Sequence, residues 1–136
     1  MNTMITTEGK TEAEILSEVI QAGIDQGGQC LDSTNSCVNS DHQGKHCFVG
    51  WLLDFEDPEL MSWGGDVVEL NHRRPDALHE LLKVTNLKTL KNLQEMHDTS
   101  EVCTLEDLAD RLQSHVKNPA VIAEWVQLRT EQIGGV

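Results

Sequence analysis

Two cysteines and two histidines lie within the fourteen-residue stretch CVNSDHQGKHCFVG, residues 37–50. Thiolate sulfur and imidazole nitrogen are the protein ligands that zinc prefers. The candidate metal ligands are Cys37, His42, His46 and Cys47. Their spacing argues against a structural zinc site, because such sites usually pair ligands on a tight C-x2–4-C knuckle, whereas nine residues separate Cys37 from Cys47. We therefore expect no cofactor, and keep a small zinc-binding module centred on Cys37 and Cys47 as an alternative.

A thiol nucleophile is the second chemistry that these residues suggest. Cys47 precedes an apolar stretch that is typical of a short helix, and a helix N-terminus lowers the pKa of a thiol. His97 and Asp98 follow later in the chain as a candidate base and its orienting acid. Neighbouring residues on a helix diverge by about 100°, however, which is poor geometry for such a pair. The sequence predicts a non-enzymatic protein, with a thiol-dependent enzyme using Cys47 and His97 as an alternative.

Four carboxylates gather in the segment DFEDPE, directly after the apolar stretch. This segment lacks the glycine and the ligand spacing of a calcium-binding EF-hand loop, so we expect a solvated acidic surface that docks on a partner. Tryptophan is enriched among the residues that dominate binding at interfaces, and one lies close by in the sequence. The predicted partner-binding residues are Asp54, Glu56, Asp57, Glu59, Met61 and Trp63.

The chain is strongly acidic, with 23 acidic and 10 basic residues in 136 and a net charge of −13. Eleven of the acids but only two of the bases lie within residues 1–60. Such a charge favours a partner protein with a basic surface. Direct binding to nucleic acid is disfavoured, because phosphate contacts need clustered cations and Arg73-Arg74 is the single basic doublet.

The segment MNTMITTEGK has neither the basic nor the apolar region of a secretory signal. No apolar run approaches the roughly 20 residues that cross a bilayer. We therefore expect a cytoplasmic protein without membrane contact, whose four cysteines are not joined in structural disulfides.

The elements that must position these residues can be read from apolar spacing and from turn residues. Thr11 and Glu14 form a predicted capping box at the start of a helix that Gly23 ends. Residues 37–40 and 45–48 flank a polar turn with Gly44, which predicts a β-hairpin that brings Cys37 and Cys47 together. Helices follow to the end of the chain. The expected fold is α+β and mainly helical: a disordered N-terminus (residues 1–10), then a single domain (residues 11–133) with an N-terminal helix, one small β-hairpin and four to five further helices.

Several helix boundaries in the second half of the chain are specified by their residues. Proline at the first helical position predicts helices that begin at Pro58 and Pro75. An apolar stripe predicts a helix over residues 87–98, a second capping box predicts a start at Thr104, and Asn118 is the expected cap of the last helix.

Four motifs resemble those of a family of small phage and prophage proteins of unassigned function. The motifs, in order, are Cys37-(x9)-Cys47-Phe48-Val49-Gly50, Leu52-Leu53-Asp54, Val67-Val68-Glu69-Leu70 and Leu93-Gln94-Glu95-Met96-His97-Asp98. The resemblance covers about residues 11–115. It implies a phage-encoded accessory protein that acts in the bacterial cytoplasm, and it implies no established activity. Together with the acidic charge, this favours a protein that binds a host defence or nucleic-acid-handling factor with a basic surface and inhibits or redirects it.

Overall fold

Helix α1 (Glu12–Asp25) opens the fold at the predicted capping box. The Thr11 hydroxyl accepts a hydrogen bond from the Glu14 amide, and the Glu14 carboxylate accepts one from the Thr11 amide. In the computed structural model, residues 4–30, 44–64 and 66–134 are described. The remaining elements are η1 (Gly50–Leu52), α2 (Pro58–Met61), α3 (Val67–Arg73), α4 (Pro75–Leu78), η2 (Leu81–Lys83), α5 (Leu87–Asp98), α6 (Val102–Leu112), η3 (Gln113–His115) and α7 (Ala120–Gly134).

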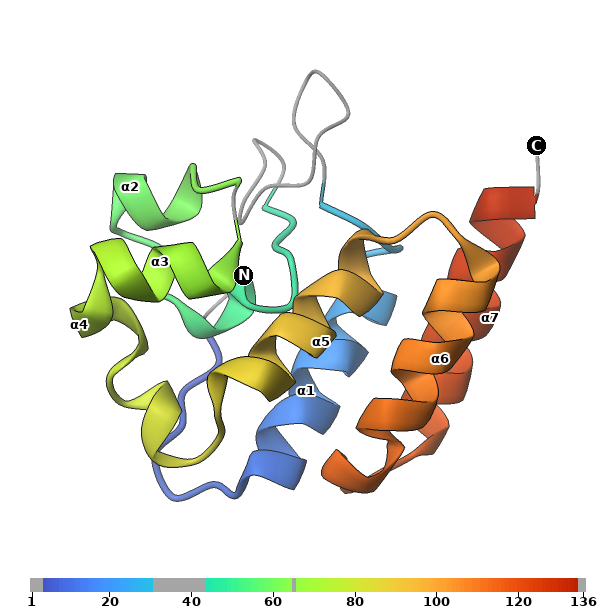
Figure 1. Ribbon diagram of the computed structural model, residues 1–136, viewed down its shortest axis with the longest axis horizontal. Helices are drawn as coiled ribbons and strands as arrows, with labels where there is room; N and C mark the ends of the chain where they lie inside the picture. Colours follow the sequence, from blue (N-terminus) through green and yellow to red (C-terminus); the bar gives the residue numbers. More distant parts are fainter. Residues whose placement is uncertain (1–3, 31–43, 65, 135–136) are drawn as a thin grey trace.

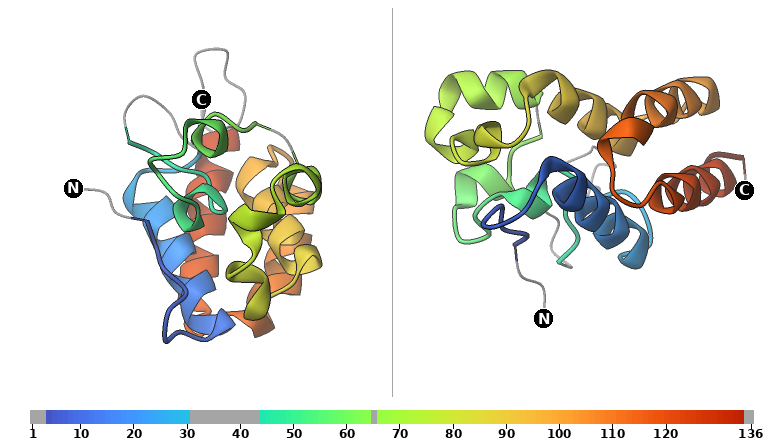
Figure 2. Two further views of the ribbon diagram at one scale, coloured as in Figure 1. Left: turned by 90° about the vertical axis from the view of Figure 1, so that its left-hand side faces the viewer. Right: turned by 90° about the horizontal axis from the view of Figure 1, so that it is seen from below.

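The helices form two packed layers (Figures 1 and 2). Helices α1 and α7 lie side by side in one layer, and α5 and α6 lie side by side in the other, with α6 also packed on α7. The short helices α2, α3 and α4 extend the structure on the side away from α7, where α3 packs on α5. No helix in the described part of the chain is long and apolar enough to cross a membrane.

The expected β-hairpin is wrong where the structure describes it, because the described residues form no strand. In the predicted second strand, residues 45–48, His46 forms a single β-bridge but no strand, and the segment passes into η1. Both backbone groups of His46 are taken by the Gln26 side chain: the His46 amide donates to Gln26 Oε1 at 2.9 Å, and Gln26 Nε2 donates to the His46 carbonyl at 2.7 Å. The predicted first strand, residues 37–40, lies outside the described residues.

Most of the predicted helix boundaries are confirmed. Proline occupies the first turn of α2 and of α4, and α5 has the predicted bounds. Asn118 Oδ1 accepts from the Ala120 amide at 3.2 Å at the start of α7. The predicted start at Thr104 is wrong, because α6 begins at Val102 and Thr104 lies inside its first turn.

Gly23 does not end α1, which continues for two residues beyond it. A Cβ atom at this position would lie 2.5 Å from Cε1 of Phe48 and 3.2 Å from Cζ3 of Trp125. Both aromatic side chains are fully buried, and their ring centroids are 4.6 Å apart. Gly23 is therefore needed where α1 meets the aromatic core, because any side chain there would overlap it.

We expect Gly23→Ala to lower the free energy of unfolding. Overpacking a core costs about 1–3 kcal/mol, which exceeds the gain of up to about 1 kcal/mol from better helix propensity. Gly134→Ala is the control, because a Cβ atom there meets nothing within 4 Å. Urea denaturation followed by far-UV circular dichroism measures both, and a Gly23→Ala protein as stable as the parent would contradict this packing.

Candidate functional site

The predicted Cys/His cluster is partly buried and partly outside the described residues. His46 and Cys47 are buried, whereas Cys37 and His42 are not among the residues described. The His46 ring stacks on Phe55 at a centroid distance of 3.9 Å and meets Trp51 edge-on at 4.7 Å. Over residues 4–30, 44–64 and 66–134, no group of three or more His, Cys, Asp or Glu side chains is arranged to hold a metal ion.

Cys47 serves a structural role at the start of η1. Its sulfur accepts a hydrogen bond from the Gly50 amide at 3.1 Å, and its carbonyl accepts one from the Trp51 amide. Burial raises the pKa of the Cys47 thiol to about 12, against a smaller opposing effect of the Gly50 hydrogen bond. The thiol is therefore protonated at neutral pH, and protonated thiols are poor nucleophiles.

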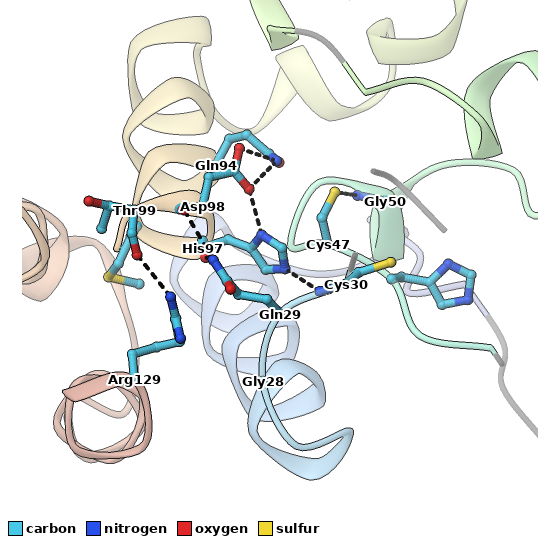
Figure 3. A network of polar contacts seen from close by, with 12 residues as sticks. Gly28, Gln29, Cys30, Cys47, Gly50, Gln94, His97, Asp98, Thr99 and Arg129 are labelled. Carbon is cyan, nitrogen blue, oxygen red and sulfur yellow. Dashed lines mark hydrogen bonds and ion pairs between the residues drawn. The ribbon is translucent and has the colours of Figure 1, made fainter. Parts of the chain in front are cut away.

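His97 lies in the last turn of α5 with no exposed surface. Its Nε2 accepts a hydrogen bond from the Cys30 amide at 3.1 Å, and its Nδ1 lies 2.6 Å from Oδ1 of Asp98 (Figure 3). Because a backbone N–H can only donate, Nε2 carries no proton and Nδ1 is the donor to Asp98. The neighbouring residues His97 and Asp98 are thus paired after all, but the nitrogen that a base would use is already occupied by the backbone.

Side chains from two other segments satisfy the carbonyl groups at the end of α5 (Figure 3). Gln29 Nε2 donates to the carbonyls of His97 and Asp98, each at 3.0 Å, and Arg129 Nη2 of α7 donates to the carbonyl of Thr99 at 3.0 Å. Gln94 Nε2 lies 3.1 Å from both carboxylate oxygens of Asp98. The sequence motif that suggested a catalytic pair is therefore the capped C-terminus of a helix.

The segment DFEDPE forms the turn that leads into α2. Asp54 Oδ1 accepts from the Glu56 amide at 2.9 Å, and Asp57 Oδ1 caps α2 by accepting from the amides of Glu59 and Leu60. Asp54, Glu56 and Glu59 are exposed, and Asp57 is half-buried. Two of these acids thus shape the turn in addition to charging the surface.

Arg74 binds three carboxylates, which the sequence reasoning missed. Its guanidinium meets Glu59 at 2.6 Å, Asp57 at 2.8 Å and Asp76 at 3.0 Å. The hydrogen bonds from Arg74 lower the pKa values of Asp57 and Asp76, and the same hydrogen bonds raise the pKa of Arg74. Asp57 and Glu59 are therefore neutralised in part. Asp54 and Glu56 have no cation within 4.0 Å among the residues described.

The two predicted anchors lie at the edge of the core. Met61 and Trp63 are half-buried and pack against core residues. Trp63 Nε1 donates to the Asp66 carbonyl at 3.4 Å, and the Arg73 guanidinium lies 5.8 Å from the Trp63 ring centroid. The structure thus brings the six predicted partner-binding residues onto α2 and the turns on either side of it.

Comparison with known proteins found no match to this chain among protein-family models, among curated proteins or among solved structures.

The first prediction from this geometry concerns thiol reactivity. Iodoacetamide at pH 7.5 should alkylate the exposed Cys103 in the folded protein, and should reach the buried Cys30 and Cys47 only in urea. Peptide mapping by mass spectrometry separates the three sites. Alkylation of Cys47 as fast as Cys103 in the folded protein would show that the thiol is activated.

The second prediction concerns Arg74. Arg74→Gln should lower stability at neutral pH, because it leaves three carboxylates together without their cation. The loss of stability should have its full size above pH 4 and should decrease in more acidic solution. The lowered pKa values of Asp57 and Asp76 mean that these carboxylates stabilise the fold only while they are ionised.

Arg73→Gln is the matched control, because Arg73 is exposed and makes one 3.9 Å pair with Glu69. Urea midpoints of both variants between pH 3 and pH 7 provide the measurement. Equal losses in the two variants, or a loss for Arg74→Gln that does not decrease as the pH falls below 4, would contradict the role assigned to Arg74.

Proposed function

We propose that this chain is a non-enzymatic, acidic, phage-type accessory protein that binds a host protein with a basic surface. Binding would inhibit or redirect that host protein, a defence or nucleic-acid-handling factor in the bacterial cytoplasm. The observation that carries the proposal is the pair of exposed carboxylates, Asp54 and Glu56, which lack a cation in the described structure. Two half-buried apolar side chains, Met61 and Trp63, follow at the end of α2 and in the turn after it.

The charge of the protein supports this binding mode. With a net charge of −13, it attracts a basic surface over distances up to about 8 Å in physiological salt, beyond which the attraction is largely screened. Complementary charge mainly raises the rate of encounter, while affinity comes from a few desolvated contacts. Trp63 and Met61 are suited to supply such contacts next to the acids.

The two chemical alternatives receive less support. The thiol enzyme requires a reactive Cys47 and an accessible His97, yet both are fully buried and the Cys47 pKa is raised to about 12. The zinc module requires Cys37 and His42, which lie outside the described residues, together with His46 and Cys47. Elemental analysis of the purified protein tests the zinc alternative directly, and an equivalent of bound zinc would favour it.

The proposed function predicts that the acids of the DFEDPE segment control partner capture. Asp54→Asn/Glu56→Gln removes two charges but keeps the Oδ1 acceptor at position 54 that shapes the turn. Immobilised parent protein should capture a bacterial partner at about 50 mM salt and release it at several hundred mM, since salt screens exposed charges. The double variant should capture at least ten-fold less.

Glu106→Gln/Asp110→Asn is the matched control, because it makes the same change in net charge on the exposed face of α6. It should capture as much as the parent protein. Equal capture by all three proteins, or capture that does not depend on salt, would overturn the proposed function.

A further inference from the structure

A groove of about 720 Å³ lies between the N-terminal segment and the short helices. Residues 4–8 form one side, and the other side is formed by α4, η2 and the turn before α2. In Figure 1 the N-terminal segment passes next to η2 before it enters α1. The segment is held in place where the Ile5 amide donates to the Trp51 carbonyl at 2.7 Å.

The groove combines apolar walls with an excess of negative charge. Five carboxylates and two cations line it, a net charge of −3. The apolar side chains that line it are Met4, Ile5, Leu52, Leu60, Ala77, Leu81 and Val84. This composition differs from that of a solvated acidic loop, because a ligand in the groove would contact apolar atoms and carboxylates at the same time.

The cations within the groove are already engaged. Arg74 holds Asp57 and Asp76, and Lys83 pairs with Glu80 at 3.1 Å. Both carboxylate oxygens of Asp76 face Arg74, and the Asp57 oxygens are divided between Arg74 and the amides of α2. These acids are fixed in position and ionised at neutral pH, since Arg74 lowers the pKa values of both aspartates.

Two carboxylates of the groove have no cation within 4.0 Å in the described part of the chain. Glu8 belongs to the N-terminal segment and Asp54 to the turn before α2, so they come from different sides of the groove. Both are exposed. A ligand with two positive groups separated by an apolar one would match this arrangement.

We propose that this groove binds an extended basic segment of the partner protein, with arginine or lysine side chains at Glu8 and Asp54 and an apolar side chain between them. The inference rests on the proposed function and assigns it a binding site. Residues 4–8 lie outside any helix and span at most about 18 Å. A segment of five or six residues is therefore long enough to occupy the groove.

The test uses a blocked hexapeptide of alternating arginine and leucine as the probe. Titration of ¹⁵N-labelled protein should shift the amide resonances of residues 5–8 and 77–84, which line the groove. A peptide with glutamate in place of arginine should not bind, and one with serine in place of leucine should bind at least ten-fold more weakly.

Two variants separate the groove from general charge attraction. Ala77→Phe fills the groove without changing the charge and should weaken binding of the probe at least ten-fold. Ala123→Phe, at an exposed position of α7, should leave probe binding unchanged. Glu8→Lys should weaken binding at least ten-fold, and Glu106→Lys on α6 by less than two-fold. Glu8→Lys provides the answer if Ala77→Phe does not fold.

The outcomes distinguish this inference from the proposed function. Equal weakening of probe binding by Glu8→Lys and Glu106→Lys, or resonance shifts away from residues 5–8 and 77–84, would overturn the groove as the binding site. The proposed function, an acidic protein that binds a basic partner, would still stand. Failure of the parent protein to bind the probe at millimolar concentration would also overturn the groove. Loss of salt-dependent partner capture is measured separately and bears on the proposed function.

Discussion

The burial of the C-terminal end of α5 is the constraint on which the rest of the fold depends. A helix end leaves backbone carbonyls without partners, and burying them unpaired costs free energy. Here Gln29 and Arg129 supply the missing donors, and His97 binds the backbone of Cys30. The His97 ring also lies between Trp125, with which it stacks, and Phe48, which it meets edge-on. One helix end thus joins the segment after α1, α5 and α7.

The same contacts explain why Cys47 and His97, a candidate nucleophile and base, are poorly placed for catalysis. Nε2 of His97 and the sulfur of Cys47 accept hydrogen bonds from backbone amides, and Nδ1 of His97 is bonded to the Asp98 carboxylate. A catalytic group needs at least one such position free for substrate. The acids of α2 and α4 differ from these groups, because Arg74 neutralises them only in part and an excess of negative charge remains at the surface. Function is therefore better sought on α2, α4 and the N-terminal segment than in the core.

The sequence predicted what local patterns determine and missed what distant side chains determine. The capping box at Thr11, the prolines that open α2 and α4, and the bounds of α5 are local features. The β-hairpin prediction was wrong and did not anticipate Gln26, twenty residues away, whose side chain binds both backbone groups of His46. Arg74 was missed for the same reason, since nothing at positions 73–75 shows that Asp57 and Glu59 lie beside its guanidinium. The sequence shows where the acids of the DFEDPE segment lie in the chain, but which of them a cation neutralises required the structure.

The pairing of α1 with α7 has a consequence for how the chain folds. Gly23 and Phe48 complete their packing against Trp125, about one hundred residues after α1 in the sequence. Contacts of such long sequence separation form slowly, because the intervening chain must lose entropy before they become favourable. A nascent chain that lacks α7 would expose the aromatic junction to solvent and to chaperones. Docking of α7 would then be the step that lets the earlier helices settle into their native packing.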